Sequence, residues 1–192
     1  MLSSLILSPS DCSPQELADF EKLVIEGGAV DPEGLAQRIS NASRLLFLRN
    51  SNGQLVGVGA LKHPRPSYRN GVFAKAGANV PSYRYRVELG WVVVAKSYQG
   101  RRLSARIIAE LLALTNNQNV FATTRADDRA ARFAAAHGFA PHGNPYPSGR
   151  GYDLVLYIYN AATPFDGEHE PVSDYRAAGD FERSGKDVTS WP

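Results

Sequence analysis

Cysteine is almost absent from this sequence, because Cys12 is the only one among 192 residues. An intrachain disulfide and a zinc site built from cysteines are therefore excluded. The four histidines are scattered without the spacing of metal ligands, so we expect no metal site. A chain without disulfides fits a reducing cytoplasm, where we expect this protein to be located.

Long apolar runs are also missing, since no run approaches the roughly twenty residues that a membrane-spanning helix needs. The N-terminus lacks the basic start and the long apolar stretch of a signal peptide. We therefore expect a soluble protein that is neither exported nor inserted into a membrane. A hydrophobic fraction of 43% and twelve prolines also argue against coiled-coil, collagen-like and wholly disordered chains. A single globular domain that acts as an enzyme or a binding module remains.

The net charge of +2 conceals three segments of different sign. Residues 1–33 carry seven acidic side chains and one basic one, and residues 165–192 carry seven acidic and three basic ones. Between them, residues 34–164 carry five acidic and seventeen basic side chains. Such a basic segment predicts an anionic ligand, either a phosphorylated cofactor or a nucleic acid. The alternative is that the acidic ends fold back and neutralise the basic middle.

The first half of the chain predicts a strand, two helices and a hairpin. A short apolar strand over 2–7 precedes a capping box at Ser13, which predicts a helix from Pro14 to Glu26. Asp31 and Pro32 are expected to open a shorter second helix. Two strands over 44–50 and 54–61, joined through an Asn-Gly pair, then indicate a tight β-hairpin.

The second half begins with a connection over 62–85 that is too long for a turn, which is typical of a functional or mobile loop. A strand buried on both faces should follow over 86–95. Further on, we expect an amphipathic helix, a strand over 119–124, a helix over 127–137 and a strand over 152–159. This order predicts an α/β fold with a mixed sheet over residues 1–160 and an acidic, poorly structured tail over 161–192.

The turn after the strand over 86–95 has the chemistry of an anion site. The first turn of a helix has unpaired backbone N–H groups and a positive dipole end, and Gly100 allows a ligand to approach the backbone closely. Lys96, Arg101, Arg102 and Arg106 add full positive charges. A pyrophosphate would suit such a site, although the same arginines could simply solvate the exposed side of the helix.

Here the sequence resembles the GNAT superfamily of acetyl-CoA-dependent N-acetyltransferases. The family signature Gln/Arg-x-x-Gly-x-Gly/Ala corresponds to Gln99-Gly-Arg-Arg-Leu-Ser104, in which Arg102 and Ser104 replace the usual glycines. Downstream, the segment from Asp127 to Phe139 is similar to the family's Asn-x-x-Ala-x-x-Phe-Tyr-x-x-x-Gly-Phe pattern. The resemblance implies a GNAT-like fold with a mixed, mostly antiparallel sheet flanked by helices.

The resemblance also implies that acetyl-CoA is the acetyl donor and lies between two splayed parallel strands. The cofactor-binding residues that it implies lie on one strand, in the turn that follows and in the downstream segment: Trp91, Val92, Val93, Val94, Gln99, Gly100, Arg101, Arg102, Leu103, Ser104, Asp127 and Phe133. Asp127 has a simpler interpretation as the N-cap of the following helix.

A primary amine must be neutral before it can attack a thioester, so a carboxylate is a sensible general base. Glu88 occupies the position where several family members keep a catalytic glutamate, although it could instead pair with Arg84 or Arg86 on its own strand face. The tyrosine that often serves as general acid is replaced by Ala134. Five other tyrosines are available and sequence selects none of them: Tyr83, Tyr85, Tyr98, Tyr146 and Tyr152.

The 62–85 connection is expected to form the acceptor side, with Arg65, Tyr68, Arg69, Tyr83 and Arg84 as substrate-binding residues. Their charge suggests an anionic acceptor amine, which could be linked to RNA or another nucleic acid. A homodimer is a further alternative, because the aromatic residues of the tail could cover a second subunit. The alternative function is a non-catalytic module that binds CoA or nucleic acid on a GNAT-like fold.

Overall fold

A seven-stranded sheet with the strand order β1-β2-β3-β4-β5-β7-β6 forms the centre of the protein. The computed structural model describes residues 1–127 and 134–161. Among the described pairs, only β4 and β5 run parallel, so the predicted mixed and mostly antiparallel sheet is confirmed. The strands are β1 Ser3–Leu7, β2 Ala42–Arg49, β3 Leu55–Lys62, β4 Val87–Val94, β5 Val120–Arg125, β6 Ala140–Pro147 and β7 Asp153–Tyr159. Of the tail expected over 161–192, only Ala161 is among the described residues.

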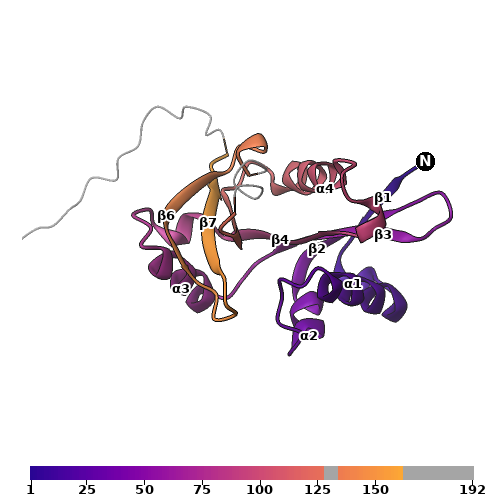
Figure 1. Ribbon diagram of the computed structural model, residues 1–192, viewed down its shortest axis with the longest axis horizontal. Helices are drawn as coiled ribbons and strands as arrows, with labels where there is room; N and C mark the ends of the chain where they lie inside the picture. Colours follow the sequence, from indigo (N-terminus) through magenta and orange to yellow (C-terminus); the bar gives the residue numbers. More distant parts are fainter. Residues whose placement is uncertain (128–133, 162–192) are drawn as a thin grey trace, which may run out of the picture.

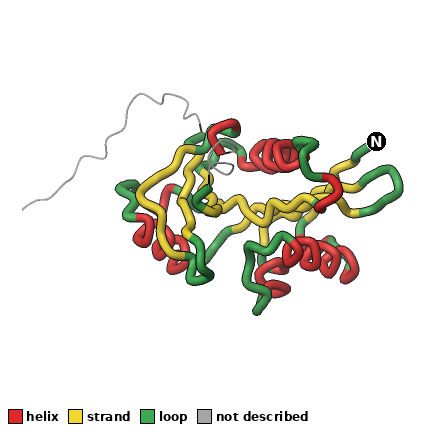
Figure 2. Tube along the Cα trace, viewed as in Figure 1, coloured by secondary structure: helices red, strands yellow, loops and turns green. Residues whose placement is uncertain are grey.

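Helices cover both faces of the sheet, with α4 on one face and α1, α2 and α3 on the other (Figures 1 and 2). Their bounds are α1 Pro14–Glu26, α2 Leu35–Ser40, α3 Pro66–Ala76 and α4 Leu103–Leu112, and short 3-10 turns lie at Pro9–Asp11, Ser82–Arg84, Lys96–Tyr98 and Ala113–Thr115. The apolar stripe of α4 packs on β2 to β5, α1 and α2 pack on β2 to β4, and α3 packs on β5 to β7. Within the described part of the chain, no helix is long and apolar enough to cross a membrane.

Local signals in the sequence explain several of these elements. The predicted helix over 14–26 is confirmed, and Ser13 and Glu16 form its capping box. The hairpin of β2 and β3 is also confirmed, but its turn differs from the expected one. Of the two turn residues, only Gly53 has a positive φ, at 78°, and Asn50 Oδ1 accepts hydrogen bonds from the N–H groups of Asn52 and Gln54.

Three elements differ from the sequence prediction. The 62–85 connection contains the helix α3, whose pattern is obscured because Arg69 occupies a position on its buried face. The second helix begins at Leu35 rather than Pro32, after a turn that ends at Gly34 in the left-handed region. The strand β6 was not predicted, because its prolines and glycine resemble a loop. As the last strand of the sheet it tolerates proline, which cannot donate a ladder hydrogen bond.

The strands β4 and β5 are paired over only two residues, Val87 with Val120 and Glu88 with Phe121. Beyond Glu88, β4 continues along β3 while β5 follows β7. The expected burial of β4 on both faces therefore holds for its first three residues, whereas the five from Gly90 to Val94 are only half-buried. The divergence opens a gap at the centre of the sheet.

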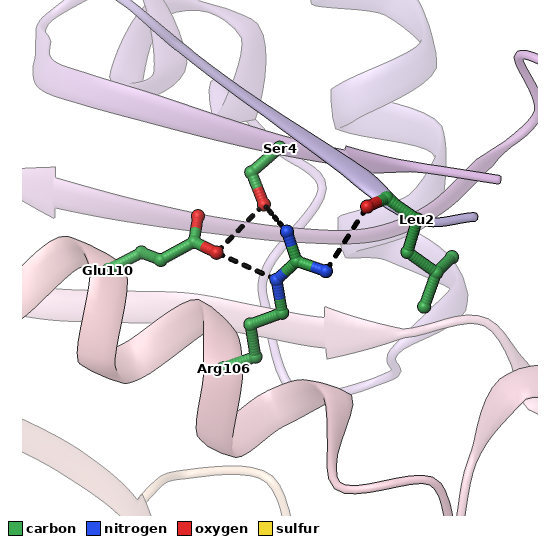
Figure 3. A network of polar contacts seen from close by, with 4 residues as sticks. All are labelled: Leu2, Ser4, Arg106 and Glu110. Atoms are coloured by element: carbon green, nitrogen blue, oxygen red, sulfur yellow. Dashed lines mark hydrogen bonds and ion pairs between the residues drawn. The ribbon is translucent and has the colours of Figure 1, made fainter.

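Helix α4 is attached to the edge strand β1 by a polar network (Figure 3). The Arg106 guanidinium donates to Glu110 Oε1 at 2.7 Å, to Ser4 Oγ at 3.0 Å and to the Leu2 carbonyl at 3.3 Å. Ser4 Oγ in turn donates to Glu110 Oε1 at 3.0 Å. Because these contacts engage all three guanidinium nitrogens, Arg106 fixes the orientation of α4, and it does not line the cavity at the anion site, where its charge was expected.

The edge strand β6 depends on close contact with the end of α3. Gly143 has a φ of +71°, and a Cβ there would lie 2.0 Å from the Ala76 carbonyl oxygen. We expect Gly143→Ala to lower the free energy of unfolding by about 3 kcal/mol, since backbone strain and overpacking add. The matched control is Gly149→Ala, which has a φ of +78° and no atom within 4 Å of the new Cβ. Urea unfolding should show a clearly smaller loss for the control; equal losses would contradict the close contact.

Candidate functional site

The turn between β4 and α4 presents backbone N–H groups that are free to bind an anion. Gly100 and Arg102 have positive φ values of 79° and 58°, and no side chain caps the helix that starts at Leu103. The first amides of a helix have no intrahelical acceptor, and the helix dipole adds positive potential there. Arg102 thus takes the backbone conformation that a glycine would adopt most easily, so the turn keeps its shape without the usual glycine.

A cavity of about 240 Å³ lies against this turn and the diverging half of β4. Its lining residues come from the end of α1, from β4 and from the turn: Gly27, Ala29, Val92, Val93, Val94, Tyr98, Gln99, Gly100, Arg102, Leu103 and Ser104. Gly27 is required for the close packing of this wall, because a Cβ there would lie 2.6 Å from a Val93 methyl group. Gly27, Ala29 and Tyr98 were not among the predicted binding residues.

The basic side chains near the turn differ in their orientation. Arg102 lines the cavity, whereas the Arg101 guanidinium stacks over the Tyr98 ring at 5.0 Å from its centroid. The Gln99 amide donates to the Val94 carbonyl at 3.1 Å and so holds the turn against the end of β4. The side chain of Trp91 lies away from the cavity and packs edge-on against Phe20.

Glu88 lies where β4 and β5 begin to diverge and is only 4% exposed. Its Oε1 atom is 2.7 Å from the Lys62 ammonium nitrogen and 3.5 Å from the Tyr68 hydroxyl, which donates to it. The expected alternative of an ion pair with Arg84 or Arg86 is wrong, because the partner is on the adjacent strand β3. Lys62 could not be identified from the sequence, since only the β3–β4 register places it opposite Glu88.

Two tyrosine hydroxyls lie near Glu88. Tyr68 is about half exposed, but burial around its hydroxyl, the Glu88 charge and then Tyr146 raise its pKa well above the ordinary value. Burial and then the Glu88 charge raise the pKa of Tyr146 to about 12. Both phenols therefore keep their protons at neutral pH and can donate hydrogen bonds. Thr123 on β5, which the sequence did not single out, lies beside the Tyr68 hydroxyl.

The remaining predicted residues are placed as follows. Arg69 is on the buried face of α3, and its Nε atom has no hydrogen-bond partner among the described residues. Arg65 precedes α3, while Tyr83 and Arg84 are exposed in the 3-10 turn before β4. Asp127 follows the end of β5, and Phe133 lies outside the described residues.

Of the helix predicted over 127–137, the structure describes residues 127 and 134–137, and residues 134–136 are helical. Ala134, at the position where a general acid was sought, packs into the core beneath α4. Across residues 1–127 and 134–161, no three His, Cys, Asp or Glu side chains gather in a way that could hold a metal ion.

The loop after α1 contacts the half of the sheet that contains β5, β7 and β6. Arg125 at the end of β5 donates to the Gly28 carbonyl at 3.1 Å, and Tyr152 before β7 donates to the Ala29 carbonyl at 3.3 Å. The Arg125 guanidinium also stacks over the Tyr152 ring at 4.3 Å. These exposed contacts connect the two halves of the sheet beyond the gap, next to the cavity wall formed by Ala29.

The part of the chain that forms the divergent strand pair, the anion-binding helix start and the buried glutamate is matched by a family model. The model is described as "Acetyltransferase (GNAT) domain" and matches residues 9–155. The chain belongs to the GNAT acetyltransferase family. Membership supports N-acyltransferase activity that uses an acyl-CoA donor.

Solved structures of GNAT-like proteins have the same fold. Escherichia coli ElaA is 16% identical, with a TM-score of 0.61 over 83% of this chain and 100% of that one. An acyl-CoA N-acyltransferase from Pseudomonas aeruginosa is 17% identical, with a TM-score of 0.59 over 83% and 99%. A Corynebacterium glutamicum structure titled "histone acetyltransferase HPA2 and related acetyltransferase" is 19% identical, with a TM-score of 0.59 over 85% and 99%. Among curated protein sequences, none matches this chain.

Two variants of Arg102 test separately how the charge and the backbone shape of the turn contribute to the site. We expect Arg102→Ala and Arg102→Gly to weaken CoA binding equally, by about fivefold, because each removes one charge facing the cavity. Only glycine adopts a φ of 58° without strain, so the glycine variant should be more stable than the alanine variant by about 1 kcal/mol. Calorimetric titration of CoA and urea unfolding measure the two effects. Unchanged CoA affinity in both variants would exclude Arg102 from the site.

Proposed function

We propose that this GNAT protein transfers an acetyl group from acetyl-CoA to a primary amine by direct attack of the amine. The observation that carries the proposal is the position of Glu88 at the branch point of β4 and β5, at the base of the strand half that lines the cavity. A buried carboxylate at the point where the two strands separate is well placed to take a proton from an incoming nucleophile.

The donor fits the residues present in the cavity. The free amides from Gly100 to Ser104 and the Arg102 charge would hold the pyrophosphate, and the exposed edge of β4 would hold the pantetheine arm. When bound there, acetyl-CoA supplies an acyl group activated as a thioester. Val92, Val93 and Val94 add apolar side chains to the lining of this cavity.

Glu88 would act on the acceptor. An ammonium group has no free electron pair, so the amine must lose a proton before or during attack. The Glu88 carboxylate can accept that proton directly or through a water molecule. The neutral phenols of Tyr68 and Tyr146 lie on the same side and supply hydrogen-bond donors around the reacting groups.

A buried arginine on α3 favours an acceptor amine that also carries a negative charge. Arg69 is only 9% exposed and has no acidic partner in the described part of the chain. A buried guanidinium without a counter-ion is costly, and a carboxylate or phosphate on the acceptor would offset that cost. The same helix brings Tyr68 into contact with Glu88, so α3 carries both residues to the side of the sheet on which Glu88 lies.

The role of Glu88 is tested by Glu88→Gln, which keeps the shape of the side chain but cannot accept the proton. We expect kcat to fall by about 100-fold or more, with little change in CoA affinity. The assay follows CoA release with a panel of amines, and Glu33→Gln, at an exposed position, is the matched control. Full activity in Glu88→Gln would remove Glu88 from the base role. Tight CoA binding without turnover of any amine would favour the alternative, a non-catalytic CoA-binding module.

The charge of the acceptor is tested by Arg69→Met. We expect KM to rise by about tenfold for amines that carry a carboxylate or phosphate, while KM for neutral amines of similar size changes little. Since a folding defect would affect both groups of amines, the ratio of the two KM values is the measurement. An acceptor linked to RNA would also give a steep dependence of KM on salt. An equal rise for charged and neutral amines would contradict the proposal.

A further inference from the structure

Lys62 and Glu88 form a buried pair at the centre of the candidate site. The two residues are opposite each other in the β3–β4 ladder, so their side chains leave the sheet on the same face. Their nitrogen and oxygen atoms are 2.7 Å apart, and the two side chains are 17% and 5% exposed. An ion pair this well shielded from water is screened little by salt and holds its geometry.

Three features of the chain hold Lys62 in this position. The Lys62 ammonium lies 4.7 Å from the centroid of the Trp91 ring, which is a favourable cation–π distance. Trp91 has a positive φ of 53°, unusual for so bulky a residue, and its strand has a register shift against β3 at this point. Gly90 leaves the space that the lysine fills, because a Cβ there would lie 2.9 Å from its ammonium nitrogen.

The contacts of Glu88 are asymmetric. Both Lys62 and the Tyr68 hydroxyl contact Oε1, whereas Oε2 accepts no hydrogen bond from the described residues. Two donors on one oxygen fix the plane of the carboxylate and leave the second oxygen available. This arrangement suits a base that must meet an incoming N–H group in one orientation.

We propose that Lys62 is a positioning residue that holds the Glu88 carboxylate through Oε1 and directs its Oε2 atom toward the acceptor amine. The proposal rests on the proposed function, in which Glu88 accepts the amine proton. In that step an N–H bond of the ammonium breaks, its electron pair stays on nitrogen to form the bond to the acyl carbon, and the proton binds to Oε2. The acyl carbon–sulfur bond would then break with its electron pair leaving on the CoA sulfur, and the second proton released as the nitrogen becomes an amide balances the formation of the CoA thiol. Lys62 itself gives up no proton and contacts neither substrate.

The first experiment measures kcat and KM against pH for the full chain and for Lys62→Met, which keeps the length of the side chain without its charge. We expect kcat to fall by about tenfold and the acidic limb of the pH profile to move upward by about one pH unit, while KM for acetyl-CoA changes less than twofold. Lys62→Arg should restore most of the activity and the pH profile. Lys22→Met, at an exposed position of α1, is the control for loss of a lysine charge.

The second experiment needs no turnover. The carboxyl signal of Glu88 in glutamate-labelled protein, assigned with Glu88→Gln, is followed by NMR during pH titration of the wild type and Lys62→Met. We expect the titration midpoint to be about one pH unit higher in Lys62→Met. An unchanged midpoint together with an unchanged pH profile would overturn the proposal. If the midpoint moves but Glu88→Gln retains full activity, the ion pair is real and the proposed role of Glu88 in catalysis is wrong.

Discussion

The separation of β4 from β5 after two paired residues is the constraint on which the candidate site depends. A parallel strand pair normally continues its hydrogen-bond ladder, but here β4 follows β3 and β5 follows β7. The outer half of β4 is left with an unpaired edge, and an extended chain of polar amide groups can pair with such an edge. The anion-binding turn, the cavity and the buried glutamate are all arranged along this one strand.

The packing on either side keeps the two strands apart. The divergence divides the sheet into a near half, β1 to β4, and a far half, β5 to β7. Helix α4 packs on one face of the near half, and its network with β1 fixes its orientation. On the opposite face, α1 supports the near half and α3 supports the far half, and each has its own apolar cluster. Glu88 is on this second face, between the two clusters, where a carboxylate is shielded from water but still has Lys62 and Tyr68 as partners.

Much of the fold could be predicted from local signals. The capping box at Ser13, the Asn-Gly turn and the apolar stripe of α4 each specify an element through neighbouring residues. Helix α3 and strand β6 could not be predicted in this way, because their formation depends on tertiary packing. A buried arginine interrupts the pattern of one, and the edge position of the other permits its prolines.

Only part of the candidate site could be predicted from the sequence. The motif from Gln99 to Ser104 is contiguous, so the sequence alone located the turn, and the positive φ of Arg102 explains how it keeps its shape without a glycine. The partner of Glu88 depends on which strands are neighbours and on their register. Twenty-six positions separate Lys62 from Glu88 in the sequence, and no local pattern could have paired them.

The contacts of Arg125 and Tyr152 join the two halves of the sheet across the gap, and they are weaker than the junction at its other end. Arg125 and Tyr152 reach the carbonyls of Gly28 and Ala29 through exposed side chains, and exposed polar contacts of this kind contribute about 1 kcal/mol or less each. At the other end, the halves are joined by the two paired residues of β4 and β5 and by packed apolar side chains from both halves. The two halves are thus held together much less firmly at this end than at the strand junction, so stress that pulls them apart would break the Arg125 and Tyr152 contacts first.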